Sequence, residues 1–156
     1  MNYQKVIVPL DGSELAECVL SHLEAIASNC KVTTVELVRV VSLVELRYWA
    51  SMSIDAAQEK KINAEAKKEA QEYLDSVKSK LDASRMQVTA TVLTGKVEDA
   101  LLEHIEKSDA DLLVIATHGR SGPGKWIMGS VAEKLVRHTC VPVFMIRPPG
   151  CIPGFK

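Results

Sequence analysis

The residues whose types and spacing could do chemistry form a glycine-rich loop that leads into a helix-forming run. Between residues 119 and 130 the chain has four glycines and two cations. Backbone N–H groups at a helix start point outward, and the helix dipole favours negative charge there. Glycine also lets the main chain approach a ligand without a Cβ in between. The loop therefore predicts a site for a phosphate group.

The loop leaves the roles of its charged and hydroxyl residues open. Arg120 and Lys125 add positive charge toward a phosphate or are ordinary surface cations. The sequence also imitates the phosphate loop Gly-x-x-x-x-Gly-Lys-Ser/Thr, but Trp126 stands where that loop needs a hydroxyl for magnesium, which argues against it. Ser130 and Glu133 match a capping box, so Ser130 is expected either to cap the helix or to help hold an anion.

A second turn of unusual composition follows the first apolar run of the chain. Asp11, Gly12 and Ser13 supply the chemistry of a turn and a helix cap. The Asp11 carboxylate is thus either a turn former or an acceptor of hydrogen bonds from a ribose or an adenine amine. His118, at the start of the glycine-rich loop, has the same two interpretations, as a structural residue or as a phosphate contact.

Motifs for catalysis and metal binding are missing from the sequence. We find no Gly-x-Ser-x-Gly, no His-Glu-x-x-His and no residue marked as a general base. The four cysteines are scattered, without a Cys-x-x-Cys pair, which is typical of a reduced cytoplasmic chain. The sequence therefore predicts no metal site of its own and no catalytic residues.

Strand-like and helical patterns alternate along the chain and must position these loops. Apolar runs at residues 5–9, 32–41, 88–93, 112–116 and 141–146 predict five strands, and helical spacing predicts helices over 15–26, 54–83, 97–105 and 130–138. Such alternation favours a mostly parallel sheet covered by helices on both faces. Ligands bind such sheets beyond the carboxyl ends of the strands, which is where both loops fall.

Length and composition limit the organisation and the partners. The 156 residues, 47% hydrophobic and 25% charged, suit one domain over residues 1–147, followed by a proline- and glycine-rich tail at 148–156. A net charge of −1 gives no overall field to attract nucleic acid or an anionic membrane. Without a long apolar segment we expect a cytoplasmic protein that uses neither as a partner.

Three motifs together resemble those of the universal stress protein family, over nearly the whole chain. Lys5 to Ser13 is similar to the family's first strand and turn. Ala116-Thr-His-Gly119, nine residues, and then Gly129-Ser130 resemble its nucleotide motif Gly-x-x-Gly-x9-Gly-Ser/Thr, with Ala116 in place of the first glycine. Val141 to Arg147 is similar to its last strand.

The resemblance implies a three-layer α/β/α sandwich with a five-stranded parallel sheet in the order 3-2-1-4-5. This fold is Rossmann-like and adenine nucleotide alpha hydrolase-like. It also implies an ATP-binding stress-response regulator with at most slow hydrolysis, Mg or Mn held through the phosphates, and a homodimer through the last strand. The implied binding residues are Pro9, Leu10, Asp11, Val40, Ala116, Thr117, His118, Gly119, Arg120, Gly122, Gly129, Ser130 and Val131.

The departure at Ala116 keeps an alternative open, a nucleotide-free dimeric interaction module of the same family. If the backbone at Ala116 is extended, the extra methyl should cost little. If a phosphate must pass over its Cα, a clash of about 1–3 kcal/mol is expected. An adenylyl transferase or kinase is a third hypothesis, which the missing base opposes.

Overall fold

The computed structural model describes residues 2–42, 56–81, 86–117 and 128–148. Five parallel strands form one sheet in the order β3-β2-β1-β4-β5, which confirms the expected order. Pairs such as Val8 with Leu37 and Ala116 with Ile146 define the register. The strands are β1 (Lys5–Pro9), β2 (Thr34–Val41), β3 (Gln87–Thr94), β4 (Leu112–Ala116) and β5 (Val143–Ile146).

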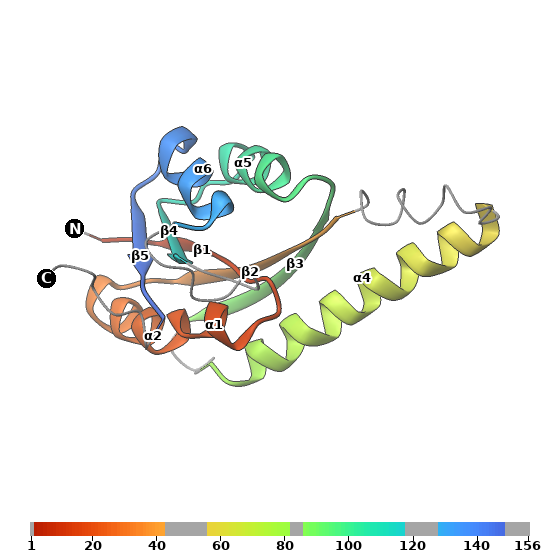
Figure 1. The fold of residues 1–156 in the computed structure, drawn as a ribbon. Coiled ribbons are helices and arrows are strands. Elements are labelled where there is room, and N and C mark those ends of the chain that lie inside the picture. Colours follow the sequence, from red (N-terminus) through yellow and green to blue (C-terminus); the bar gives the residue numbers. More distant parts are fainter. Residues whose placement is uncertain (1, 43–55, 82–85, 118–127, 149–156) are drawn as a thin grey trace, which may run out of the picture.

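Helices cover both faces of the sheet, as Figure 1 shows. One face packs against α1 (Glu14–Glu17), α2 (Val19–Cys30) and α4 (Ala56–Ser79), and the other against α5 (Val97–Lys107) and α6 (Ser130–His138). The strands are apolar along most of their length because both of their faces are buried. The core accordingly forms two clusters, one on each side of the sheet.

Several predicted boundaries need correction. The single helix expected over residues 15–26 is two helices, because the chain turns at Cys18, whose N–H donates to the Ala16 carbonyl. The helix expected over 54–83 ends earlier, at Ser79. The last strand begins at Val143 instead of Val141, directly after Pro142, which has no N–H to donate. The second strand likewise begins at Thr34 instead of residue 32.

Other predictions were correct or fall outside the described residues. The strand over 112–116 and the helix over 130–138 have the expected bounds. The segment 43–55, which includes most of the loop expected over 42–53, and residues 149–156 of the expected tail are not described. No helix in the described parts of the chain is both long and apolar enough to cross a membrane.

Candidate functional site

The turn after β1 presents Asp11 at the carboxyl edge of the sheet. The Asp11 Oδ1 atom accepts hydrogen bonds from the backbone N–H of Ser13 at 2.9 Å and from its hydroxyl at 2.6 Å. The Ser13 hydroxyl oxygen in turn accepts from the N–H of Ala16 at 3.2 Å, so Ser13 caps α1. Gly12 between them has φ +88°, a conformation that favours glycine. The predicted turn and cap are therefore confirmed.

Two neighbours of Asp11 contribute to the same edge in different ways. Pro9 ends β1, and the N–H of Leu10 donates to the Val38 carbonyl at 2.8 Å. The Leu10 side chain is buried in the core cluster that α2 and α4 cover. Leu10 therefore contributes packing, and only its backbone lies along the edge.

Near the end of β2, successive side chains face opposite sides of the sheet. Val40 packs against the core cluster under α5 and α6. Arg39 points the other way, with its Cζ atom 4.8 Å from the centre of the Tyr73 ring on α4. Its guanidinium also lies on Gly12, where a Cβ would come within 2.9 Å of Nη2. We call Asp11, Gly12, Arg39 and Tyr73 the carboxyl-edge cluster.

Tyr73 stands in a half-buried, charged environment. Burial, followed by the negative charges of Glu17 and Asp11, raises the pKa of its phenol, and the positive charge of Arg39 opposes that shift. The hydroxyl oxygen is buried, and no described residue is placed to hydrogen-bond with it. Glu17, which forms an ion pair with Lys80 at 2.7 Å, thus acts on Tyr73 through its charge and not through a well-formed hydrogen bond.

A backbone hydrogen bond connects the residue after β4 to the residue before α6. The N–H of Thr117 donates to the Ile146 carbonyl of β5, and the Thr117 carbonyl accepts from the N–H of Gly129, each at 2.8 Å. A Cβ on Gly129 would lie 3.1 Å from the same carbonyl, so only a residue without a side chain fits here without displacement. The N–H of Gly129 is therefore occupied in holding α6 against β4.

The helix start itself corrects one sequence prediction. Gly129, with φ −55° and ψ 144°, is the N-cap of α6, and no side chain caps this helix. Ser130 is already helical and exposed, so the capping box predicted for Ser130 and Glu133 is not formed. The first bond of the helix runs from the N–H of Glu133 to the Gly129 carbonyl at 2.9 Å. The three N–H groups at Ser130, Val131 and Ala132 thus precede it without an acceptor inside the helix.

Ala116, the residue that departs from the nucleotide motif, is the last residue of β4. It pairs with Ile146 of β5, and its side chain belongs to the core cluster on the α2 and α4 side. Among the described residues, the one non-glycine residue with positive φ is Lys31. The backbone at Ala116 is therefore extended, as the tolerant alternative requires.

The topology brings most of the predicted site residues to one edge. In a parallel sheet the carboxyl ends of adjacent strands meet, so the ends of β1, β2 and β4 and the start of α6 share this edge. Four predicted residues, His118, Gly119, Arg120 and Gly122, lie outside the described residues. The sequence reasoning missed Arg39, although a charged residue inside an apolar strand was a usable signal.

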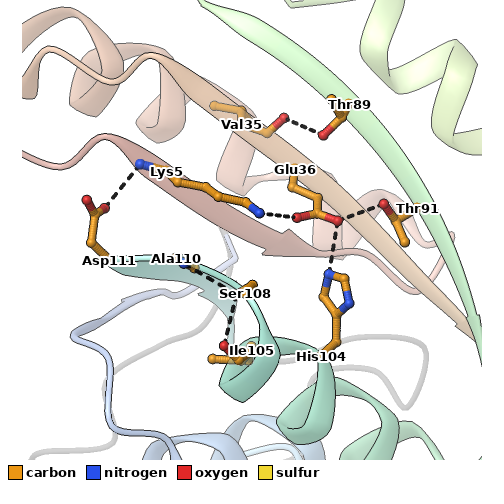
Figure 2. Close-up of polar contacts among 10 residues, drawn as sticks. All are labelled: Lys5, Val35, Glu36, Thr89, Thr91, His104, Ile105, Ser108, Ala110 and Asp111. Carbon is orange, nitrogen blue, oxygen red and sulfur yellow. Dashed lines mark hydrogen bonds and ion pairs between the residues drawn. The ribbon is translucent and has the colours of Figure 1, made fainter.

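A second polar cluster lies on the face of the sheet that α5 covers, and it is drawn in Figure 2. Glu36 of β2 is buried; its Oε1 accepts from the Thr91 hydroxyl at 2.7 Å and lies 2.9 Å from Nε2 of His104, while its Oε2 is 3.2 Å from the Lys5 ammonium. We call Lys5, Glu36, Thr91 and His104 the Glu36 network. Burial raises the pKa of Glu36, but the Thr91 and Lys5 hydrogen bonds and the charges of His104 and Lys5 outweigh it, so that its pKa is lowered.

The Glu36 network is a structural link and not a binding site. Its members come from β1, β2, β3 and α5, and they converge on one carboxylate. Both oxygens of Glu36 are already engaged, which leaves little capacity for a ligand. No local pattern predicted this role for Glu36 or His104, because the contact joins residues 68 positions apart.

The sheet order and the two covered faces define a doubly wound three-layer α/β/α protein. The sequence model of the Universal stress protein family matches residues 2–147. The chain therefore belongs to the universal stress protein family.

Curated relatives and solved structures agree with this assignment. Universal stress protein MJ0531 of Methanocaldococcus jannaschii is 29% identical over 149 residues, which cover 94% of this chain and 84% of the relative. Universal stress protein YxiE of Bacillus subtilis is 27% identical over 152 residues, 93% of this chain and 99% of the relative. The solved structure of MJ0577 has a TM-score of 0.80 at 22% identity and covers 94% of this chain and 97% of its own.

Two further structures with the same fold contain nucleotides. A universal stress protein in complex with cAMP has a TM-score of 0.63 at 20% identity, covering 94% of this chain and 98% of its own. A family member from Arabidopsis thaliana with AMP bound has a TM-score of 0.63 at 16% identity, covering 94% and 93%. At these identities the likeness establishes the fold that the proteins share.

Proposed function

We propose that this protein is an ATP-binding, dimeric stress-response regulator of the cytoplasm, with at most slow hydrolysis. The nucleotide would lie across the carboxyl edge of the sheet, between the turn after β1 and the start of α6. The observation that carries the proposal is the helix start at Ser130 to Ala132. Its N–H groups have no acceptor inside the helix, and the Gly129–Thr117 contact fixes them beside the end of β4.

The residues at this edge fit an adenine nucleotide. Pro9, Asp11 and Val40 would border the base and the ribose, with the Asp11 carboxylate accepting hydroxyl or amine hydrogens. The N–H groups of Ser130 and Val131 would donate to the phosphates, where the helix dipole favours negative charge. The glycines and Arg120 of the preceding loop are proposed to complete this contact.

Two findings support the nucleotide-binding alternative over the nucleotide-free one. The methyl of Ala116 lies in the core and its backbone is extended, so it has no need of the conformations that only glycine adopts. The universal stress proteins solved with cAMP and with AMP are relatives of the same fold whose ligands are adenine nucleotides. ATP extends these ligands by phosphates, to which the first N–H groups of α6 would donate because they have no acceptor inside the helix.

A divalent cation would enter with the nucleotide. Among the described residues, no group of three or more histidine, cysteine, aspartate or glutamate side chains could hold a metal ion. We therefore propose that Mg or Mn is held through the phosphates, where it would neutralise part of their charge. The protein's own groups would bind and orient the nucleotide, and regulation would follow from binding.

Isothermal titration of the intact chain with Mg-ATP tests the proposal. At a protein concentration of about 50–100 μM, micromolar affinity gives a clear binding isotherm. The same titration with Mg-GTP is the control for the base, since the contacts proposed for Asp11 and Val40 concern adenine. Absence of heat with ATP, together with absence of nucleotide in the supernatant of freshly purified, heat-denatured protein, would favour the nucleotide-free interaction module.

The dimer part of the proposal rests on the free edge of β5. This strand pairs with β4 on one side and ends the sheet on the other, and both Phe144 and Met145 are more than 40% exposed. An exposed apolar edge strand is a site for pairing with another chain. Sedimentation should show a dimer that Phe144→Glu weakens, while the control Glu106→Lys on α5 leaves it intact. A monomeric wild-type chain would contradict this part alone.

A further inference from the structure

The Arg39 guanidinium lies beside the turn after β1, which suggests that Arg39 affects nucleotide binding indirectly, through this turn. We propose that Arg39 is a positioning residue for the nucleotide site. Its guanidinium packs beside Gly12 and thereby holds the turn that presents Asp11. The inference rests on the proposed function, because it concerns the ribose and base end of that same site. It assigns to Arg39 an effect on affinity that acts through Asp11.

Two elements, β2 and α4, hold the Arg39 guanidinium in one place. Arg39 follows Val38 in β2, and the Val38 carbonyl accepts a hydrogen bond from the N–H of Leu10, so β2 runs beside β1 up to the turn. On the other side, the Tyr73 ring of α4 lies under the guanidinium, with 4.8 Å between Cζ and the ring centre. A planar cation stacked on an aromatic ring at this distance is held by a cation–π interaction.

The Arg39 guanidinium fills the space beside Gly12. A Cβ on Gly12 would lie 2.9 Å from Nη2 and 3.0 Å from Cζ of Arg39, closer than side chains pack. The positive φ of Gly12 favours glycine at this position, and the Arg39 guanidinium fills the space that a Cβ would enter. Arg39 takes the place that a side chain would occupy and limits the movement of the turn.

The turn after β1 sets the position of the Asp11 carboxylate. Asp11 is one residue before Gly12, and Ser13, one residue after it, donates twice to Asp11 Oδ1. The negative charges of Asp11 and Glu17 raise the pKa of Tyr73 and the positive charge of Arg39 opposes this shift, so all three are near enough to act on the same phenol. Loss of the guanidinium would free the turn and spread the Asp11 carboxylate over several positions.

The experiment compares two ligands that share phosphates but differ in the nucleoside. Affinities for Mg-ATP and for inorganic tripolyphosphate are measured by titration for wild type, Arg39→Lys and Arg39→Met. We expect ATP to bind about tenfold more weakly to both variants, because neither side chain has a planar cation, while tripolyphosphate binds unchanged. The control is Arg137→Met, an exposed arginine on α6, which should leave both affinities at the wild-type value.

Three results would overturn the inference. Full ATP affinity in Arg39→Met would show that the turn needs no such support, and full affinity in Arg39→Lys would show that charge alone suffices. An equal loss for tripolyphosphate would place Arg39 at the phosphates. Urea unfolding of each variant shows whether the chain is folded, and Arg39→Lys serves as the conservative substitution if Arg39→Met does not fold.

A double-mutant cycle with Asp11→Asn separates positioning from direct contact. If Arg39 acts through Asp11, Arg39→Lys should cost much less than tenfold in the Asp11→Asn background. The same tenfold loss in both backgrounds would mean that Arg39 touches the ligand itself and would overturn the inference. If wild type binds no ATP, the proposed function fails and the inference with it; if wild type binds and the cycle is additive, only the inference fails.

Discussion

The two polar clusters of this protein differ in how completely their groups are used. In the Glu36 network, one buried carboxylate has contacts with Lys5, Thr91 and His104, and both of its oxygens are engaged. At the carboxyl-edge cluster the Asp11 carboxylate is half-buried, and the neighbouring start of α6 has donors without helical acceptors. The first cluster surrounds one carboxylate inside the fold, whereas the second lies at the sheet edge where we propose that a nucleotide binds.

This difference teaches that a set of titratable residues is not by itself a functional site. Lysine, glutamate and histidine in contact would attract attention as possible acid–base groups, yet here, together with Thr91, they join three strands to a helix (Figure 2). The carboxyl-edge cluster has titratable groups as well, but it lies where the strands end and the chain leaves the sheet. Position at the carboxyl edge of the sheet therefore indicates the proposed site better than the kind of residue does.

The largest effect should come from breaking the Glu36 network. Glu36→Ala leaves the Thr91 hydroxyl and the His104 ring without their shared acceptor and opens a small cavity. We expect a loss of about 2–4 kcal/mol in the free energy of unfolding, less than for a fully buried ion pair because Lys5 is partly exposed. Urea unfolding measures the loss, and Mg-ATP affinity at a temperature where the variant is folded should not change.

The control for this prediction is Glu103→Ala, another glutamate on the same side of the sheet. Glu103 is exposed on α5 and pairs with Lys107, so its removal should leave the unfolding curve unchanged. If both alanine variants unfold at the wild-type urea concentration, the Glu36 network is not the link described above.

The next largest effect is expected at the carboxyl-edge cluster, on ligand binding and not on stability. Asp11→Asn keeps an oxygen that can accept from Ser13 but removes the negative charge and one acceptor. We expect Mg-ATP to bind about tenfold more weakly, which corresponds to about 1.4 kcal/mol, with little change in stability. Titration and urea unfolding of the same preparation check both parts. A destabilised variant with normal affinity would reverse the comparison between the clusters.

A smaller effect should come from Ser13, which serves both the helix and the site. Ser13→Ala removes the cap on the N–H of Ala16 and the hydroxyl that donates to Asp11. We expect a loss of about 1 kcal/mol in stability, the usual cost of an N-cap, together with a weakening of Mg-ATP binding by a few-fold. Ser79→Ala at the end of α4 is the control, since the Ser79 hydroxyl donates only to the Ser76 carbonyl nearby.

The smallest expected effect is on how the free energy of unfolding depends on pH. Because the folded state lowers the pKa of Glu36, this group contributes stability above its unfolded pKa, and the contribution is lost as the pH falls through the folded pKa. The free energies of unfolding of wild type and Glu36→Gln should therefore approach each other between about pH 5 and pH 3. Denaturant titrations at several pH values test this; a constant gap over that range would show that Glu36 does not carry the dependence.

Much of the fold and part of the candidate site could be predicted from the sequence. The strand over 112–116, the helix over 130–138 and the turn at Asp11 follow from local patterns, and the resemblance supplied the sheet order. The capping box at Ser130 failed, because the chain enters the helix at Gly129, which the Thr117 carbonyl holds in place. A charged residue within the apolar second strand was a signal at Glu36 and Arg39, but their contacts could not be predicted, because the partners come from other elements.

The sequence by itself determined the alternation of strands and helices and the glycines that the turns require. These depend on residues a few positions apart, through hydrophobic period, capping and the conformations open to glycine. Only the tertiary structure decided which residues meet the charged side chains: Thr91 and His104 contact Glu36 across 55 and 68 positions, and Arg39 lies beside Gly12 and Tyr73. Such contacts arise from packing separate elements together, and no local pattern in the chain records them.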